Sequence, residues 1–403
     1  MDPKNFPPLR AVEQIVLQGT SLCNLDCRYC DLSQESRRTN ARMPVELVTQ
    51  LLQQLVSLNL LAPSVSIVWH SGEPLTLPPA YYSAAIDDVR DFVARRAPGL
   101  KVSFDFQTNA TLIDDEWCDF FEKYAAVVRL GVSCDGPQHT HDAFRIDWNG
   151  RGSSARTQRG MAQLDERGIA YNVIAVVTDR TMVNQEEFFE FFLQRRQSMT
   201  DFHFNVLASP VPGITGLSYI DTDRDRYRNF YERMLELSQT VSSSGSTLPI
   251  RNLSQAVHRL AALGQPGTPT YVRETSAPLR SLNMDTRGNL TTFHAGLDIA
   301  TQRQRYQDGE GFGIGNLQRE SLAEMIGTTK FIQMRADFAR MHLRCESECE
   351  YFSICPGGFE LLQMSALDAD PQAPSETTEC LIHVKALTDA VINVLEANAA
   401  RDQ

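Results

Sequence analysis

Three cysteines lie within eight residues near the start of the chain, where Cys23, Cys27 and Cys30 form a C-x3-C-x2-C pattern. One loop can wrap thiols at this spacing around a small iron–sulfur cluster. Four cysteines would fill a [4Fe–4S] cube, so three leave one iron without a protein ligand. Because an open metal position is where a substrate or cofactor binds and reacts, the pattern indicates a catalytic centre. A structural zinc knuckle or three core thiols are the alternatives, but zinc sites usually pair two C-x2-C units.

An aromatic residue, Tyr29, stands just before the third cysteine, and the loop therefore resembles the signature of the radical S-adenosylmethionine (SAM) enzymes. In that family the amino and carboxylate groups of SAM's methionine chelate the open iron. A second segment, Ser71-Gly72-Glu73-Pro74, resembles the family's GGEP motif, with Ser71 in place of the first glycine. The resemblance implies that Gly72, Glu73 and Pro74 bind the methionine amine.

Short β-prone runs alternate with helical patterns through the first 240 residues, and each strand end carries polar residues. This alternation predicts an α/β fold with an open, partial (β/α)6 TIM-like barrel at residues 1–240. The expected strands are Val12–Gly19, Val65–Trp69, Val102–Gln107, Val127–Ser133, Tyr171–Thr178 and Phe202–Leu207. The expected helices are Leu47–Leu58, Ile113–Tyr124, Thr157–Arg167, Gln185–Gln194 and Tyr227–Leu237.

The polar residues after the third and fourth strands are candidate cofactor contacts. Asn109 ends the third strand, and Ser133 and Arg145 belong to a segment that resembles the SAM-binding region of relatives with C-terminal cluster domains. Arg145 suits a bidentate grip on a carboxylate, and a surface ion pair is its alternative. We expect His139 and His141 to be solvated loop residues and not metal ligands. The two remaining cysteines, Cys118 and Cys134, are expected to be core thiols.

The C-terminal part has a different character, with a hairpin expected at Leu282–Leu290 and a second cysteine group beyond it. Four thiols can complete a cluster without an open iron, although they also suit Zn²⁺. These four are Cys345, Cys349, Cys355 and Cys380. The region resembles the SPASM domain of peptide-modifying radical SAM enzymes, which carries auxiliary [4Fe–4S] clusters. Phe293 and Phe359 replace two expected cysteines, so one auxiliary cluster is predicted.

These patterns divide the chain into a barrel at residues 1–240, a linker at 241–280 and a SPASM-like domain at 281–403. A mobile loop is expected at Ser242–Ser246, and the last element, Cys380–Leu395, is expected to be a packed helix.

Beyond the general class, the chain resembles the GrrM type of peptide maturases, through its Trp69–Leu75, Gly288–Phe293, Tyr351–Cys355 and Glu376–Cys380 segments. That resemblance implies cross-linking of an aromatic side chain to a β-carbon in a ribosomally made precursor peptide, which yields a cyclophane. Asp285 and His294 are candidate acceptors of the ring proton, with solvated loop residues as the alternative. A sulfatase-maturase-like oxidase, a thioether-forming maturase and a non-catalytic peptide-binding protein are the competing functions.

The charge and the terminal composition limit the partners. Thirty-eight basic residues face 50 acidic ones, and the net charge of −12 argues against a nucleic-acid substrate held through its phosphates. The first ten residues contain three prolines and no apolar run, so neither an export signal nor a membrane anchor is expected. A cytoplasmic location follows, because nine cysteines without such a signal favour metal ligation over disulfides. The expected partners are the precursor peptide and an electron donor such as flavodoxin or ferredoxin.

The cysteine groups predict the iron content. Anaerobically reconstituted protein is expected to hold two [4Fe–4S] clusters, or about eight irons, since the seven cysteines form one three-ligand and one four-ligand group. Iron and zinc assays measure this directly. About twelve irons would show that a third cluster is present. About four irons with stoichiometric zinc would make the C-terminal site a structural zinc site.

Overall fold

The computed structural model describes residues 9, 11–30, 32–206, 224–243, 248–263, 278–292, 305–306 and 309–401. Nine strands form one sheet in the order β6-β5-β4-β3-β2-β1-β7-β8-β9. The first seven strands pair in parallel and the last two pairings are antiparallel. The strands are β1 (Val12–Leu17), β2 (Leu61–Trp69), β3 (Lys101–Thr108), β4 (Val128–Ser133), β5 (Tyr171–Val177), β6 (Met199–Val206), β7 (Ser281–Met284), β8 (Asn289–Thr291) and β9 (Gly313–Asn316).

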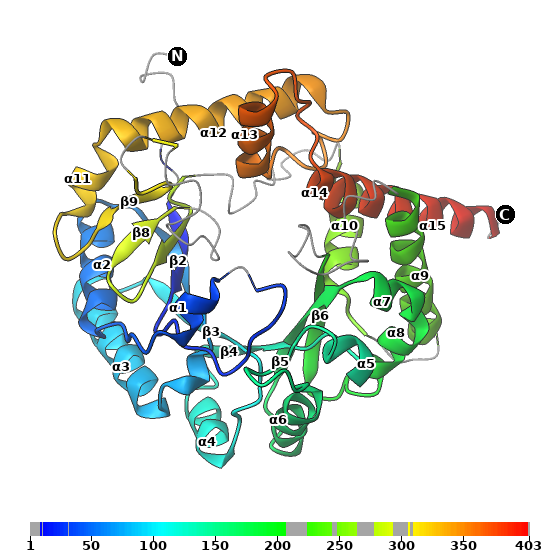
Figure 1. Cartoon of the computed structure of the whole chain (residues 1–403), viewed down its shortest axis with the longest axis horizontal. Coiled ribbons are helices and arrows are strands. Elements are labelled where there is room, and N and C mark those ends of the chain that lie inside the picture. Colours follow the sequence, from blue (N-terminus) through cyan, green and yellow to red (C-terminus); the bar gives the residue numbers. More distant parts are fainter. Residues whose placement is uncertain are drawn as a thin grey trace.

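Helices cover the outer face of this curved sheet, as Figure 1 shows. The helices of the barrel are α1 (Gln34–Arg38), α2 (Glu46–Ser57), α3 (Pro79–Arg96), α4 (Asp115–Lys123), α5 (Gln138–His141), α6 (Ser154–Glu166), α7 (Asp179–Val183), α8 (Gln185–Leu193), α9 (Arg224–Ser243) and α10 (Arg251–Ala262). A short 3-10 turn, η2 (Pro74–Thr76), follows β2. The C-terminal helices are α11 (Leu322–Ile326), α12 (Thr329–Glu348), α13 (Glu360–Ala369), α14 (Thr378–Cys380), the π-helical η4 (Leu381–Ala386) and α15 (Leu387–Arg401).

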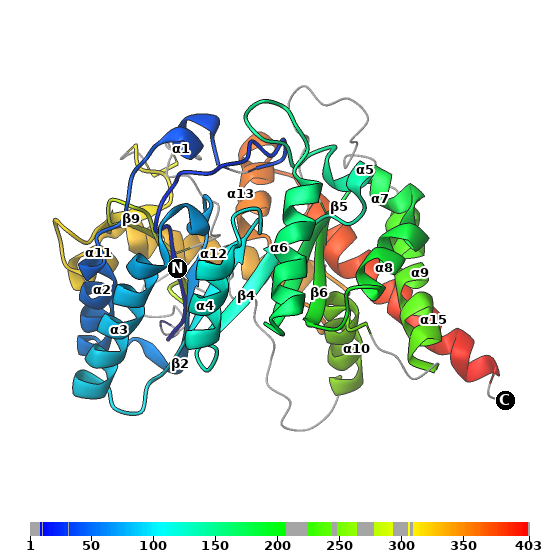
Figure 2. The same cartoon turned by 90° about the horizontal axis from the view of Figure 1, so that it is seen from below.

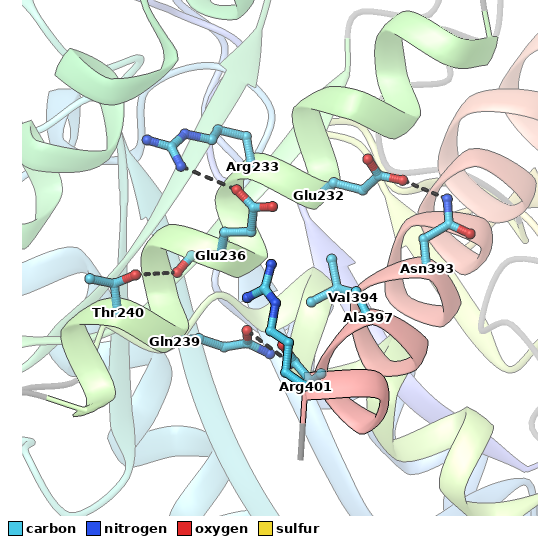
Figure 3. A pocket seen from close by; sticks show the side chains of 10 residues that line it. Glu232, Arg233, Glu236, Gln239, Thr240, Asn393, Val394, Ala397 and Arg401 are labelled. Carbon is cyan, nitrogen blue, oxygen red and sulfur yellow. Dashed lines mark hydrogen bonds and ion pairs between the residues drawn. The ribbon is translucent and has the colours of Figure 1, made fainter. Parts of the chain in front are cut away.

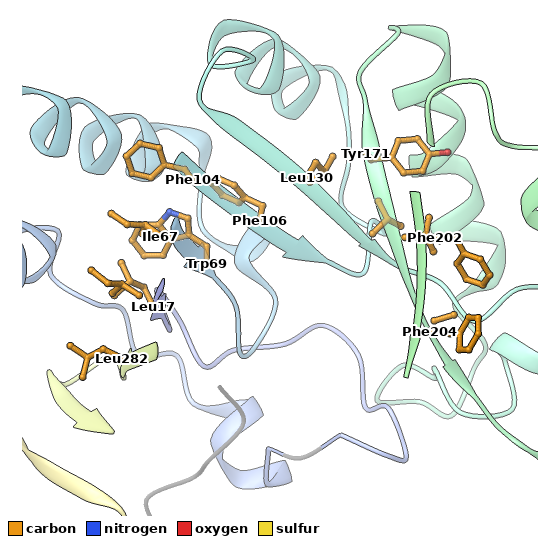
Figure 4. Close-up of a cluster of buried hydrophobic side chains, with 14 of the residues drawn as sticks. Leu17, Ile67, Trp69, Phe104, Phe106, Leu130, Tyr171, Phe202, Phe204 and Leu282 are labelled. Atoms are coloured by element: carbon orange, nitrogen blue, oxygen red, sulfur yellow. The ribbon is translucent and has the colours of Figure 1, made fainter. Parts of the chain in front are cut away.

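The core lies between the sheet and its helices. Side chains alternate across a strand, and in β3 the buried Phe104 and Phe106 point to the helices while Asp105 between them lies on the other face. Trp69 of β2 packs edge-on against Tyr82 of α3, with ring centroids 5.1 Å apart. Figure 4 shows this layer of large apolar side chains running from β7 to β6. The packed layer fixes the register of the strands and so fixes where each strand ends.

The C-terminal helices close the open side of the barrel. In Figure 1 they run as an arc from β9 to α9. Helix α11 contacts β9 and α2 at one end of the arc, and α15 contacts α9 and α10 at the other. Arg224 of α9 donates hydrogen bonds to Tyr351 and to Asp389 of α15, and Tyr351 also donates to Asp389 at 2.6 Å. This bond network ties the second cysteine segment to the barrel.

The structure confirms the expected partial barrel, and it adds elements that the sequence did not reveal. The expected hairpin is present, but its strands extend the barrel sheet beside β1. Helices α3 and α12 were not expected, and helix α9 continues to Ser243, into the segment expected to be a loop. No helix among the described residues is long and apolar enough to cross a membrane.

Candidate cluster and cofactor site

The first cysteine group follows β1 at the carboxyl end of the sheet. Its loop is held by antiparallel backbone pairing with the segment after α5, since Asp26 N donates to the Ile146 carbonyl at 2.7 Å and Arg28 N donates to the Phe144 carbonyl at 2.9 Å. From the other side, the buried Arg37 donates to the Leu25 carbonyl and pairs with Asp26 at 2.8 Å. The three thiols are therefore presented by a loop with fixed backbone.

Glu73 connects this loop to the two neighbouring strand ends. Its backbone N–H donates to the Leu22 carbonyl at 2.9 Å. Its buried carboxylate accepts hydrogen bonds from Leu75 N at 3.0 Å, Thr108 Oγ1 at 2.6 Å and Asn109 N at 2.8 Å. Both carboxylate oxygens are thus used to hold the turn and the end of β3. A direct contact between this carboxylate and a ligand ammonium stays a prediction.

The two residues before Glu73 explain why the turn needs small side chains. Gly72 has a φ of +101°, and a Cβ there would lie 2.5 Å from the Thr20 carbonyl oxygen. Ser71 also has a positive φ, of 69°, which is the conformation that glycine adopts most easily. Ser71 therefore stands where the resembled motif has its first glycine, at a position with a glycine-like backbone.

Asn109 lies at the end of β3, as expected, and its side chain reaches the cysteine loop. Its amide donates to Asn24 Oδ1 at 2.8 Å, and Asn24 in turn donates to Thr111 Oγ1 at 2.7 Å. Asn24 is the residue directly after Cys23. The end of β3 and the first cysteine are consequently locked together through side-chain amides.

Ser133 ends β4 and faces the neighbouring β3. Its hydroxyl accepts a hydrogen bond from Gln107 Nε2 at 2.8 Å. A Cβ on Gly131 would lie 2.3 Å from Gln107 Oε1, so the glycine leaves the space that this amide occupies. Gln107 thereby holds the side chain predicted to contact the SAM ribose.

Arg145 is buried and bidentate with Asp135, with Nε–Oδ2 and Nη2–Oδ1 distances of 2.9 and 3.1 Å. Asp135 also accepts hydrogen bonds from the Tyr29 hydroxyl and from Val176 N. The surface ion pair considered as the alternative for Arg145 is thus a buried pair that joins β4, β5 and the cysteine loop.

The electrostatics show that the separate motifs meet. Burial raises the pKa of Cys27 to about 12, and the nearby charge of Arg145 opposes this rise. Burial also raises the pKa of Glu73 to about 7, while its three hydrogen bonds and the charge of Arg145 lower it. Arg145 therefore acts on both the cysteine loop and the Gly-Glu-Pro turn.

The second cysteine group lies at the end of α12, the following loop and α14. Burial raises the pKa of Cys345 to about 11, and the charges of Cys380 and Cys349 add to the rise. Phe359, where the SPASM resemblance expects a cysteine, stacks on His383 with ring centroids 6.1 Å apart. An aromatic pair therefore occupies that position.

Both groups fit a cluster better than a single ion. Among the described residues, no three cysteine, histidine or carboxylate side chains converge to hold one metal ion. A [4Fe–4S] cube takes one thiolate on each iron, so its ligands do not converge on one point. Three or four thiols from one short loop or from adjoining elements are the donor set that such a cube uses.

The proposed proton acceptors are less well supported. Asp285 accepts hydrogen bonds from Arg287 N and from both Asn289 N and Nδ2, so its carboxylate holds the β7–β8 turn. Phe293 and His294 lie outside the described residues. The expectation for His141 was wrong: it is fully buried, with Nε2 3.0 Å from Ser153 Oγ, because α5 packs it under the strand ends. Cys118 and Cys134 are buried, as expected.

Sequence reasoning missed the residues that support the site. Asn24, Asp135 and Gln107 act on the motif residues through side-chain contacts between distant segments, and such contacts leave no local pattern. Trp148 donates from its indole nitrogen to the Cys23 carbonyl at 2.9 Å. A tryptophan in a polar loop was a signal that could have identified this contact.

A cavity of about 630 Å³ lies elsewhere, between α9 and α15 (Figure 3). Arg233 and Glu236 pair across it, and Asn393 donates to Glu232 at 2.6 Å. It contains no cysteine, and its residues connect the C-terminal helix to the barrel. Its lining is Glu232, Arg233, Glu236, Gln239, Thr240, Asn393, Val394, Ala397, Asn398 and Arg401.

Comparisons with known proteins agree with this geometry. Residues 17–192 match the Radical SAM superfamily model. An uncharacterised protein of Synechocystis is 29% identical, with 98% of this chain and 94% of that protein aligned. The cysteine-type anaerobic sulfatase-maturating enzyme of Clostridium perfringens (strain 13 / Type A) is 23% identical, with 91% and 92% aligned. The structure of anSMEcpe with bound AdoMet and Cp18Cys peptide superposes with a TM-score of 0.73 at 18% identity, covering 97% of this chain and 99% of that one.

The fold and the site define a class. The matched region, the partial barrel and the three-cysteine loop make this a radical SAM barrel. Its C-terminal extension follows the architecture of anSMEcpe.

The Glu73 network predicts a large effect of a small change. Glu73→Gln places an amide NH2 against one of the three donors that the carboxylate now accepts, so a buried donor loses its partner. We expect the free energy of unfolding, measured in urea, to fall by about 1–3 kcal/mol. Glu116→Gln, at an exposed site in the first turn of α4, is the matched control and is expected to change stability by less than about 0.5 kcal/mol. Equal stability of wild type and Glu73→Gln would contradict the network.

His141 predicts a pH dependence. Burial lowers its pKa from 6.5 to about 4, so the unfolded chain binds a proton that the native protein does not between those values. Stability therefore decreases as the pH falls from 6.5 toward 4, by about 2 kcal/mol between pH 7 and pH 5. His141→Gln should remove this part of the slope, whereas His139→Gln, at a half-exposed side chain, should keep it. Parallel slopes for His141→Gln and wild type would show that burial of His141 does not set this dependence.

Proposed function

We propose that this protein is a radical SAM enzyme that oxidatively modifies a side chain of a peptide or protein substrate. The observation that carries the proposal is the meeting of the three-cysteine loop, the Gly-Glu-Pro turn and Arg145 at the carboxyl end of one sheet. In TIM-like barrels this edge holds the chemistry. Cys23, Cys27 and Cys30 would hold the cluster, and Gly72–Pro74, Asn109, Ser133 and Arg145 would hold SAM.

The bound cluster and SAM supply a 5′-deoxyadenosyl radical, which takes a hydrogen atom from an unactivated C–H bond. The chain's own contribution is positioning. Asp135 fixes the guanidinium of Arg145, Gln107 fixes Ser133, and the paired backbone of residues 25–28 and 144–147 shields the loop. Exclusion of water and oxygen by this packing protects a reactive centre.

The C-terminal thiols support an oxidative outcome. After hydrogen is removed, a second electron must leave the substrate to complete an oxidation. A single auxiliary [4Fe–4S] cluster on Cys345, Cys349, Cys355 and Cys380 could accept it. The Arg224, Tyr351 and Asp389 network holds this segment against the barrel, which favours electron exchange between the two parts.

Similarity to a cysteine-type sulfatase-maturating enzyme and to a structure with bound peptide supports a sulfatase-maturase-like oxidation as the first candidate. Cyclophane formation is the second candidate. It is favoured by the replacement of two expected cluster cysteines with Phe293 and Phe359, which matches the GrrM-type resemblance. His294 is the proposed proton acceptor for that reaction.

Two cysteine variants test the assignment of the clusters. Cys27→Ala is expected to abolish cleavage of SAM to 5′-deoxyadenosine, because it removes a ligand of the cluster with the open iron. Cys380→Ala is expected to keep some reductive cleavage and lose product formation, since the four-ligand cluster has no open iron. Chromatography of dithionite-reduced reactions measures both. Equal cleavage by Cys27→Ala and wild type would remove the basis for the enzyme class.

The type of product is tested by co-expression with a candidate precursor peptide, followed by mass spectrometry. Each modification is expected to remove two hydrogens, and an aldehyde that reacts with a hydrazide reagent identifies a sulfatase-maturase-like oxidation of serine. A product that is inert to hydrazide and resists fragmentation between two residues indicates a cross-link, and blocked cysteine alkylation indicates a thioether. Deuterium at the attacked β-carbon is expected in 5′-deoxyadenosine. Label transferred only from an α-carbon would favour epimerisation or an α-thioether.

A further inference from the structure

An arginine-rich surface covers the loop of Cys23, Cys27 and Cys30. We define the arginine patch as Arg28, Arg38 and Arg42, all of which are exposed. Arg28 belongs to the cysteine loop itself, Arg38 ends α1, and Arg42 pairs through its backbone with Thr20 just before the loop. Figure 2 shows α1 at one end of the barrel, with the chain from the cysteine loop beside it. The patch therefore lies over the candidate cluster.

Trp148 connects this patch to a cluster ligand. Its indole N–H donates to the carbonyl of Cys23 at 2.9 Å. The guanidinium carbons of Arg38 and Arg37 lie 4.4 and 5.2 Å from the centre of its ring. Cation–π contacts of this kind hold the arginines in place without neutralising their charge. The half-buried ring thus forms a short bridge between the backbone of Cys23 and the surface.

The charge of the patch stands out against the chain as a whole, which carries −12. Within the described part of the chain, no carboxylate lies in ion-pair range of the three patch arginines. The two nearest acidic side chains are engaged by other arginines, Asp26 by Arg37 and Asp147 by Arg151 and Arg156. The patch therefore keeps a positive field above an acidic protein.

We infer that the arginine patch docks a small acidic protein that carries a low-potential one-electron centre. The inference rests on the proposed function, because a radical SAM reaction requires an electron at the three-cysteine cluster. The step is simple in its balance: the donor's reduced centre loses one electron, the cluster gains it, and no atom is transferred. Electron transfer between proteins is fast only over short distances, and Trp148 marks the point where a ligand of the cluster approaches the surface. A positive patch steers an acidic donor to that point.

The test compares charge reversal with a matched control. Arg28→Glu/Arg38→Glu reverses the patch, and Arg90→Glu/Arg95→Glu makes the same charge change on exposed residues in the C-terminal half of α3, at the opposite end of the barrel. Stopped flow measures reduction of the reconstituted protein by flavodoxin hydroquinone, and calorimetry measures binding of oxidised flavodoxin. We expect the patch variant to lose at least about tenfold in the association rate and in affinity. The wild-type rate should fall as salt is raised, while that of the patch variant should stay nearly constant.

A cationic small donor separates the possible failures. Reduced methyl viologen should reduce wild type and both variants within about twofold of one another and support equal SAM cleavage, since it needs no docking site. Unchanged flavodoxin kinetics and affinity in the patch variant, with viologen reduction intact, would overturn the docking inference alone. Failure of viologen to drive SAM cleavage in wild type would overturn the proposed function. A duplex DNA oligonucleotide that binds the patch more tightly than flavodoxin would replace the proposed partner with a nucleic acid.

Discussion

The site depends on one buried carboxylate. Glu73 accepts three hydrogen bonds from its own turn and from the end of β3, and its backbone donates to the cysteine loop. A buried carboxylate is costly unless its oxygens are satisfied, so these partners must keep their places together. The ends of β1, β2 and β3 are thereby held in one arrangement before any cofactor binds. Asp135 has the same role between the cysteine loop, Arg145 and β5.

The rest of the chain supports that arrangement from a distance. The packed layer between the sheet and the helices sets the strand register, and the register brings three chain segments to one edge. The C-terminal arc then joins β9 to α9 and brings the second cysteine group against the barrel. Two redox-active groups in one rigid frame are what an oxidative radical reaction requires.

Much of this could be predicted from sequence. Local patterns were sufficient for the six parallel strands and for the loop of Cys23, Cys27 and Cys30, because hydrophobic periodicity and close cysteine spacing are local signals. The contacts of Asp135 and Gln107 could not be predicted, since each depends on the register between strands. His141 was misjudged because a polar sequence around it does not show that α5 packs it beneath the sheet. The pairing of β7 with β1 joins residues about 270 positions apart, and no local pattern encodes such a pairing.

The central claim is that the three-cysteine cluster keeps an open iron for SAM beside Glu73 and Arg145. The most direct measurement is the electron paramagnetic resonance spectrum of a reduced variant, Cys345→Ala/Cys349→Ala, which retains only the first cysteine group. The account predicts a [4Fe–4S]⁺ signal whose g-values shift when SAM is added. A signal that SAM leaves unchanged, in protein with about four irons per chain, would contradict the claim.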